Sequence, residues 1–206
     1  MRSYKDSLQL FSQPLGRQME ELYSAPYLII HRAHLHGVLV QEADRLGVAI
    51  HLDSHFTRIN FSDPSVELSN GKTYDAEIVL GEDGERSACR DALLGYDISS
   101  RDSGDHVFRI TVKASNGTEH KDMMDLVQPP YVNHCVGPGA NAITYALKRN
   151  CLLNVVLTCA CDVSKTIQHG LRKAEIHEAR EVFGRWDDRF QTLLSLAQRC
   201  TKWTLL

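Results

Sequence analysis

The sequence predicts an α+β protein, with an α/β layer first, an antiparallel sheet next and helices last. In the first part, apolar residues at helical spacing lie between two short apolar runs, which is the pattern of a strand–helix–strand unit. From residue 106 to residue 161, long strand-like runs follow one another with short turns, as in antiparallel sheets. These changes in period predict three parts, 1–100, 101–172 and 173–206, with the terminal helices packing back on the first part.

The α/β layer is expected to hold two parallel strands around one helix. After a short helical turn at 18–23, the apolar run 27–30 predicts a strand. Leucine, valine and alanine then recur at helical spacing over 35–46, and Gly47 is a typical helix end. The run 48–52 predicts the second strand, so that the three elements form one parallel unit.

A period-two meander is expected after this unit. Apolar and polar residues alternate between residues 56 and 76, which is typical of strands with one buried face. Asn70-Gly71 lies between two such stretches and is a strong hairpin signal. The β-branched run 78–80 then predicts a buried strand.

A glycine-bearing turn joins that strand to a short helix. Gly81 and Gly84 permit backbone angles or close approaches that a side chain would block. Ser87 is a typical N-cap for the helix, and Gly95 is a typical end. A strand, a glycine turn and a helix N-terminus often hold an anion, but an ordinary strand-to-helix connection has the same pattern.

The second half of the chain predicts an antiparallel sheet followed by two helices. The spacing of apolar residues places the helices over 173–183 and 188–198. A turn is expected at 148–150. The strands are expected over 106–113, 131–137, 141–147 and 152–158.

Composition limits the classes of function. The chain has 206 residues, 43% of them apolar, and a net charge of −3 without a basic patch, so we expect a packed core and no nucleic-acid partner. No apolar run is long enough to span a membrane and no signal peptide is visible, so we expect a cytoplasmic protein. The six cysteines lack a disulfide or zinc pattern, and no metal site is assigned to them or to the histidines at 31, 34 and 36.

Several motifs, in one order along the chain, resemble a known family. Residues 81–90 have the order G-x-D-G-x-x-S-x-x-R, which closely resembles the second flavin-binding motif of the class A FAD-dependent aromatic monooxygenases, the salicylate-hydroxylase-like group. Residues 31–36 resemble the family's H-R-x-x-L-H segment, and residues 137–145 resemble its substrate-domain strand pair. Arg185-Trp186-Asp187 and Lys202-Trp203 resemble its later helical region. The resemblance therefore runs along nearly the whole chain.

The resemblance also shows what this sequence lacks. The family has a G-x-G-x-x-G turn that holds the FAD pyrophosphate and a later G-D-A-x-H-like segment that closes the flavin site, and neither occurs here. We therefore expect the middle of such an enzyme, with a partial FAD-binding domain and weak FAD binding. In the family the first strand lies within the FAD-domain sheet, so we expect a homodimer or a strand of this chain moved into the gap.

The resemblance implies FAD contacts from Arg32, Asp83 and Gly84. A guanidinium at a helix start suits phosphate recognition, although Arg32 could instead pair with a nearby carboxylate. Asp83 can accept from backbone N–H groups or a ribose hydroxyl, and Gly84 lets the cofactor approach. Glu82 beside a pyrophosphate would repel it, and Arg90 is expected to be structural.

The resemblance also implies a substrate pocket lined by Arg109, Asn141 and Tyr145. Several hydroxylases of the family have a histidine at the position of Asn141, where it assists deprotonation of a phenolic substrate. The amide of Asn141 cannot take a proton at neutral pH. Arg109 and Tyr145 are equally compatible with simple sheet-surface positions, and no catalytic residue is assigned.

By this resemblance the chain is a truncated FAD-dependent monooxygenase-like protein, related to hydroxylases of small aromatic or polyketide-like substrates. Complete members use FAD, with NAD(P)H as reductant, and act on a small molecule; the cofactor carries the chemistry. The alternative is a cofactor-free protein that binds a hydrophobic metabolite and guides a cyclisation or isomerisation, or a binding remnant without catalysis. The sequence leaves open whether the chain by itself is an enzyme.

Overall fold

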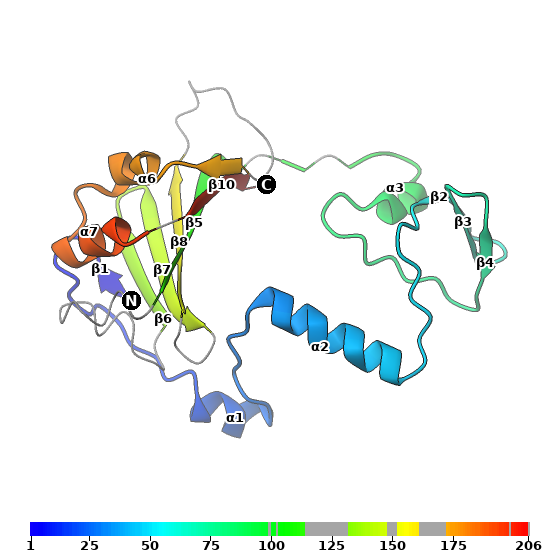
Figure 1. The fold of residues 1–206 in the computed structure, drawn as a ribbon, viewed down its shortest axis with the longest axis horizontal. Helices are drawn as coiled ribbons and strands as arrows, with labels where there is room; N and C mark the ends of the chain where they lie inside the picture. Colours follow the sequence, from blue (N-terminus) through cyan, green and yellow to red (C-terminus); the bar gives the residue numbers. More distant parts are fainter. Residues whose placement is uncertain are drawn as a thin grey trace. The chain divides into compact units, whose positions relative to one another are not determined.

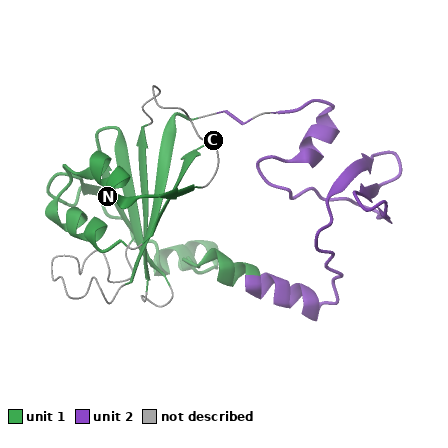
Figure 2. Cartoon of the chain, turned by 45° about the horizontal axis from the view of Figure 1, so that its top comes forward, with its two compact units in different colours: residues 1–36, 102–206 green, residues 37–101 purple. Residues whose placement is uncertain are grey.

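The computed structural model describes residues 1–98, 100–101, 103–113, 132–147, 152–160, 172–197 and 199–205. By their contacts these residues form two compact units (Figure 2): unit 1 is Met1–His36 with Asp102–Leu206, and unit 2 is Gly37–Arg101. Helix α2, Arg32–Arg45, crosses the boundary between them. This division differs from the predicted one, because the N-terminal segment groups with the second half of the chain.

Unit 1 is built on a seven-stranded sheet (Figure 1). The edge strand β1 pairs with β6 in parallel, and all other pairs are antiparallel. The four strands expected from the sequence are therefore confirmed as β5 to β8; Tyr131 and the expected turn at 148–150 lie outside the described residues. In sheet order the strands are β1 (Arg2–Ser3), β6 (Val132–Gly137), β7 (Ala140–Leu147), β8 (Leu152–Ala160), β5 (Asp105–Lys113), β10 (Cys200–Leu205) and β9 (Arg172–Ala174).

Two helices, α6 (Ile176–Phe183) and α7 (Asp188–Ser195), cover one face of this sheet (Figure 1). Phe183 and Leu193 belong to one buried core with sheet residues such as Phe108 and Leu157. Because side chains alternate between the two faces of a strand, the residues between these core positions point away from α6 and α7. We call this second face the distal face.

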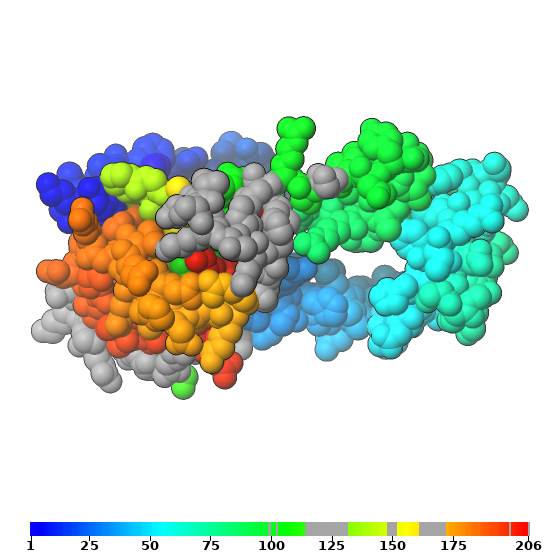
Figure 3. All heavy atoms as spheres, turned by 90° about the horizontal axis from the view of Figure 1, so that it is seen from above, coloured from blue at the N-terminus to red at the C-terminus, as the bar shows by residue number. Residues whose placement is uncertain are grey.

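The N-terminal segment is fastened to the turn between α6 and α7. The Tyr4 ring lies 5.9 Å from that of Trp186, and the Asp187 backbone N–H donates to the Tyr4 carbonyl over 3.0 Å. Ser7 donates to the Asp187 carboxylate. In Figure 3 the dark blue N-terminal residues accordingly lie beside the orange segment that includes α6. The short helix α1, Arg17–Tyr23, follows and has no buried residue.

The C-terminal part departs from its expected helical pattern at both ends. Residues Arg172–Ala174 form strand β9, and α6 begins only at Ile176, after a capping box between Glu175 and Glu178. Cys200–Leu205 is a strand rather than a helical region, because it pairs with β5 on one side and β9 on the other. Within unit 1 the helices pack on the sheet of the second half of the chain.

Unit 2 holds a three-stranded antiparallel meander of β2 (Phe56–Asn60), β3 (Ser65–Leu68) and β4 (Thr73–Asp75). The expected hairpin is confirmed, with Gly71 at its turn in a positive-φ conformation (φ 78°). The expected short helix is also confirmed as α3, Ala88–Leu94. The predicted long helix is confirmed as α2.

Three predicted strands of the α/β layer are wrong: 27–30, 48–52 and 78–80 have no strand structure. A β-strand requires a neighbour that accepts and donates its backbone hydrogen bonds, and no described strand pairs with these segments. Their side chains are accordingly exposed, as Ile78 (75%) and Leu80 (79%) show, except that of Val79, which is half-buried. The parallel unit expected around α2 is therefore not formed in the described part of the chain.

The described cysteines are all free thiols. Cys135, Cys159 and Cys200 are buried free thiols, and Cys89 is a half-buried one. Burial raises the pKa of the Cys135 thiol and raises that of Cys200 to about 11, so both are poor nucleophiles at neutral pH. Among the described residues, no three histidines, cysteines or carboxylates gather as metal ligands, and no helix combines the length and apolar character needed to cross a bilayer.

Candidate functional site

The glycine-bearing turn of unit 2 is held by Asp83 and the first turn of α3. The Ser87 hydroxyl donates to one Asp83 carboxylate oxygen over 2.5 Å, and the Cys89 backbone N–H donates to the other over 3.0 Å. Ser87 Oγ in turn accepts from the backbone N–H of Arg90 over 3.0 Å, as expected of an N-cap. The hydrogen bond from Ser87, followed by that from Cys89, lowers the pKa of Asp83 to about 2.

Two glycines of this turn serve different purposes. A Cβ at Gly81 would lie 2.7 Å from Cys89 Cβ, so only glycine allows the turn to approach α3 this closely. Gly84 has φ +81°, a conformation that other residues rarely adopt, while the space beside it is open. The motif therefore has a structural reason at both glycines.

Arg90 is structural, as predicted. Its guanidinium donates to the Asp91 carboxylate over 3.1 Å and to the carbonyls of Glu85 and Ile98 over 2.8 and 3.0 Å. These contacts fasten α3 to the segments on both sides of it. Glu82, the predicted source of repulsion toward a phosphate, is exposed.

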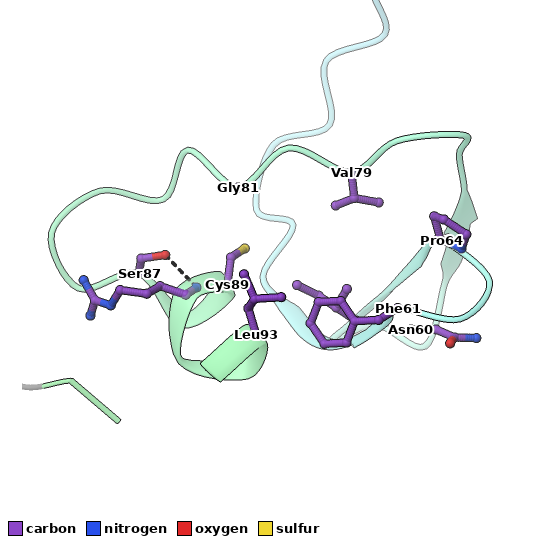
Figure 4. Close-up of a pocket in the computed structure, with 10 residues that line it drawn as sticks. Asn60, Phe61, Pro64, Val79, Gly81, Ser87, Cys89 and Leu93 are labelled. Atoms are coloured by element: carbon purple, nitrogen blue, oxygen red, sulfur yellow. Dashed lines mark hydrogen bonds between the residues drawn. The ribbon is translucent and has the colours of Figure 1, made fainter. Parts of the chain in front are cut away.

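A cavity of about 470 Å³ lies beside this turn (Figure 4). Cys89 and Leu93 of α3 line one side, and Phe61 and Val79 line the other. Its wall is mostly apolar, with Asn60, Ser87 and Arg90 as the polar residues. The full lining is Ile59, Asn60, Phe61, Pro64, Val79, Gly81, Ser87, Cys89, Arg90 and Leu93.

The predicted FAD contacts lie in different units of the chain. Arg32 is exposed at the start of α2 in unit 1, without a hydrogen bond or ion pair to another described residue, so the alternative of a carboxylate partner finds no support there. Asp83 and Gly84 lie in unit 2. The two amides of α3 that an anion would use already donate to Asp83 and Ser87. These two amides are therefore not open to a phosphate at this turn.

The three predicted pocket residues all lie on the distal face of the unit 1 sheet. The strand register places Arg109 opposite Val156, which is opposite Ile143. Asn141 and Tyr145 are two residues on either side of Ile143 and thus share its face. Both are half-buried, whereas Arg109 is exposed.

Arg109 is held over an aromatic ring. Its guanidinium carbon lies 5.5 Å from the ring centre of Trp203, which is on the same face of β10. Such cation–π contacts hold the guanidinium in place without neutralising it. Lys173 on β9 is in the same row, opposite Thr201, so it adds a second cation to this row of the sheet.

Two distal-face residues were missed by the reasoning from sequence. Asn154 lies opposite Tyr145, is 5% exposed, and its Nδ2 has no hydrogen-bond partner. His134 lies opposite Ile143 and is half-buried. Alternation along β6 puts His134 and Val132 on one face, but only the register of β6 against β7 places His134 beside Asn141 and Tyr145.

Comparison with known proteins gives a consistent family. A 3-amino-4-hydroxybenzoate 2-monooxygenase from Streptomyces cremeus is 30% identical over 206 residues, covering 99% of this chain and 48% of the relative. The FAD-dependent monooxygenase OpS4 of Beauveria bassiana is 28% identical over 190 residues, covering 91% of this chain and 44% of the relative. No protein-family model matches.

The fold agrees with these relatives. A substrate complex of salicylate hydroxylase superposes with a TM-score of 0.69 at 21% identity, covering 85% of this chain and 46% of that structure. This chain thus spans about half the length of the curated relatives it matches. The predicted resemblance is confirmed: along nearly its whole length the chain is similar to about half the length of FAD-dependent aromatic monooxygenases.

Proposed function

We propose that unit 1 binds a small aromatic carboxylate on its distal face, as the substrate-binding part of an FAD-dependent hydroxylase. The observation that carries the proposal is the convergence of Arg109, Asn141 and Tyr145 on one face, with Trp203 beside Arg109. The names of relatives that act on hydroxybenzoates support the same class of ligand.

The distal face offers each part of such a ligand a partner. Arg109 and Lys173 present positive charge to a carboxylate, and a guanidinium can bind it through two parallel hydrogen bonds. Trp203 and Tyr145 offer aromatic surfaces to the ring. Asn141 can donate to or accept from a ring hydroxyl.

In this proposal FAD, when bound, supplies the oxygen chemistry of hydroxylation. The residues of this chain bind the ring, fix its orientation and hold the hydroxyl group. The use of NAD(P)H, a homodimer and a cytoplasmic location stay predictions from the sequence. Purified material in size-exclusion chromatography with light scattering would test the dimer.

Calorimetric titration with 3-hydroxybenzoate tests the proposal. We expect saturable binding to the wild-type chain, and at least tenfold weaker binding to Arg109→Gln, because a charge-assisted hydrogen bond contributes about 1.5–3 kcal/mol. Arg185→Gln is the matched control, since Arg185 is an exposed arginine on the turn after α6. Equal affinities for the wild type and Arg109→Gln would reject this site.

A cofactor-free binding or isomerising protein is the second candidate. It is favoured by the Asp83 carboxylate, which already accepts hydrogen bonds from Ser87 and Cys89. Purified protein that is colourless but changes an added aromatic ligand would favour it. Yellow protein with bound flavin would favour the hydroxylase.

A further inference from the structure

One side chain on the distal face can accept a proton, which Asn141 cannot do. Asn141 cannot accept a proton, Tyr145 is itself a weak acid, and the arginine at position 109 is permanently charged. His134 is the one imidazole on the described part of the distal face, and a neutral imidazole has a ring nitrogen whose lone pair can accept a proton.

The position of His134 fits that purpose. It lies opposite Ile143, so Asn141 and Tyr145 are its diagonal neighbours on β7, at about 7–8 Å between Cα atoms. The ring is half-buried and has no hydrogen bond or ring contact with another described residue. No described residue therefore occupies its ring nitrogens, which leaves them open to a ligand in this part of the chain.

The charges around His134 are few. On β7 it faces the uncharged Asn141 and Ile143 and the phenol of Tyr145. On its other side, strand β1 places Arg2 on the opposite face, where its Nε donates to Asn133 Oδ1 over 3.1 Å. Arg109 is in the same row but three strands away, about 14 Å at ordinary strand spacing.

We propose that His134 is the proton acceptor for a phenolic hydroxyl bound on the distal face, taking the place that a histidine at position 141 would fill. This rests on the proposed function. The O–H bond of the phenol breaks, its electron pair stays on the oxygen, and an N–H bond forms on the imidazole, which later releases the proton to water. Arg109 holds the carboxylate at the other end of the same ring.

The ionisation of a coloured phenol tests the inference. The probe is 4-hydroxy-3-nitrobenzoate, whose phenolate absorbs visible light, titrated from pH 4 to 9 in the presence of excess protein. In the wild-type complex we expect the midpoint of ionisation to lie at least one pH unit below that of the free probe, since an imidazolium stabilises the phenolate. His134→Gln should bind the probe but lose most of this shift.

Two further variants separate the chemistry from damage to the fold. His177→Gln removes an exposed histidine on α6 and should keep the full shift. Adding Asn141→His to His134→Gln should restore the shift, because the two positions are diagonal neighbours.

Each outcome is decisive. Loss of the shift in His134→Gln and its return in the double variant would support His134 as the proton acceptor. An equal shift in the wild type and His134→Gln, or no shift in either complex, would overturn His134 while leaving ligand binding intact. No binding of the probe by any variant would overturn the proposed function and, with it, this inference.

Discussion

Apolar runs of similar sequence have different structures in the two units. In unit 1 the apolar run of β8 pairs with β5 and β7, and its residues Val155 and Leu157 are fully buried. In unit 2 the equally apolar run 78–80 pairs with no described strand, and Ile78 and Leu80 stay exposed while Val79 is half-buried. Strand propensity is similar in the two runs, so the presence of pairing neighbours makes the difference.

The two units also differ in the interactions that hold them together. Unit 2 holds its glycine-bearing turn by local hydrogen bonds around Asp83 and by the caps of α3. Unit 1 is held by a core that joins distant parts of the chain, from Tyr4 to Leu194. The local caps and turns were therefore predicted correctly in both units, whereas the parallel α/β unit expected in the first part of the chain did not form.

The largest expected effect is on the affinity for FAD, and it tests the turn of unit 2. Without a G-x-G-x-x-G loop, two or three charge-assisted hydrogen bonds to the pyrophosphate are missing, which weakens binding by about 3–9 kcal/mol. That is roughly two to six powers of ten in affinity. We expect a millimolar dissociation constant or weaker in a flavin-fluorescence titration. Stoichiometric yellow protein would show that unit 2 forms a complete site.

The next largest effect is expected on the free energy of unfolding when an apolar side chain is truncated. Truncation in each unit compares the two directly. Phe183 is fully buried against Trp186 and Phe190, so Phe183→Ala should lower the free energy of unfolding of unit 1 by about 3–5 kcal/mol. Leu80→Ala in unit 2 should cost less than about 0.5 kcal/mol, because Leu80 is exposed. Urea denaturation measures both. A large cost at Leu80 would mean that run 78–80 is packed in solution.

A smaller loss of stability is expected from a substitution where the N-terminal segment contacts the sheet. A Cβ at Gly137 would lie 2.9 Å from Tyr4 Cγ and 3.2 Å from Trp186 Cζ2. Gly137→Ala should therefore destabilise unit 1 by about 1–3 kcal/mol through overpacking. The control Gly37→Ala, with nothing near its Cβ, should be neutral or slightly stabilising in helix α2. Equal melting temperatures for the two variants would argue against this contact.

The smallest effect concerns Glu178, and it depends on pH. Hydrogen bonds from Arg172, with a further contribution from Lys202, lower the pKa of Glu178 from its ordinary 4.5 to about 2. The carboxylate therefore contributes stability above about pH 4.5, and that contribution is lost as pH falls through about 2. Glu178→Gln should cost about 1 kcal/mol at pH 7, since the pair is partly exposed, and nearly nothing at pH 2. A cost that is independent of pH would reject the ion pair as its cause.

Much of the fold could be predicted because its signals are local. The caps at Ser87 and Gly95, the hairpin at Asn70-Gly71 and the period-two strands of the second half need no knowledge of distant partners. The strands predicted for 27–30, 48–52 and 78–80 were wrong, because a strand forms only where neighbouring strands pair with its backbone. Strand β10 was missed because a short segment next to a helix was assigned by its similarity to a helical region.

The candidate site could be predicted in part. Arg109, Asn141 and Tyr145 were named from the sequence, but their common face depends on the register between β5, β8 and β7, which no local pattern sets. For the same reason the reasoning passed over His134, whose relation to Asn141 exists only across β6 and β7.

The most direct test of the account uses the two tryptophans of the chain, which lie on opposite sides of the sheet. Trp203 is beside Arg109 on the distal face, and Trp186 is buried under the N-terminal segment near α7. Their two indole N–H signals, followed by NMR during titration with 3-hydroxybenzoate, report the two sides separately. The account predicts that the Trp203 signal moves and saturates while that of Trp186 stays in place. Movement of Trp186 alone, or of neither signal at saturating ligand, would contradict it.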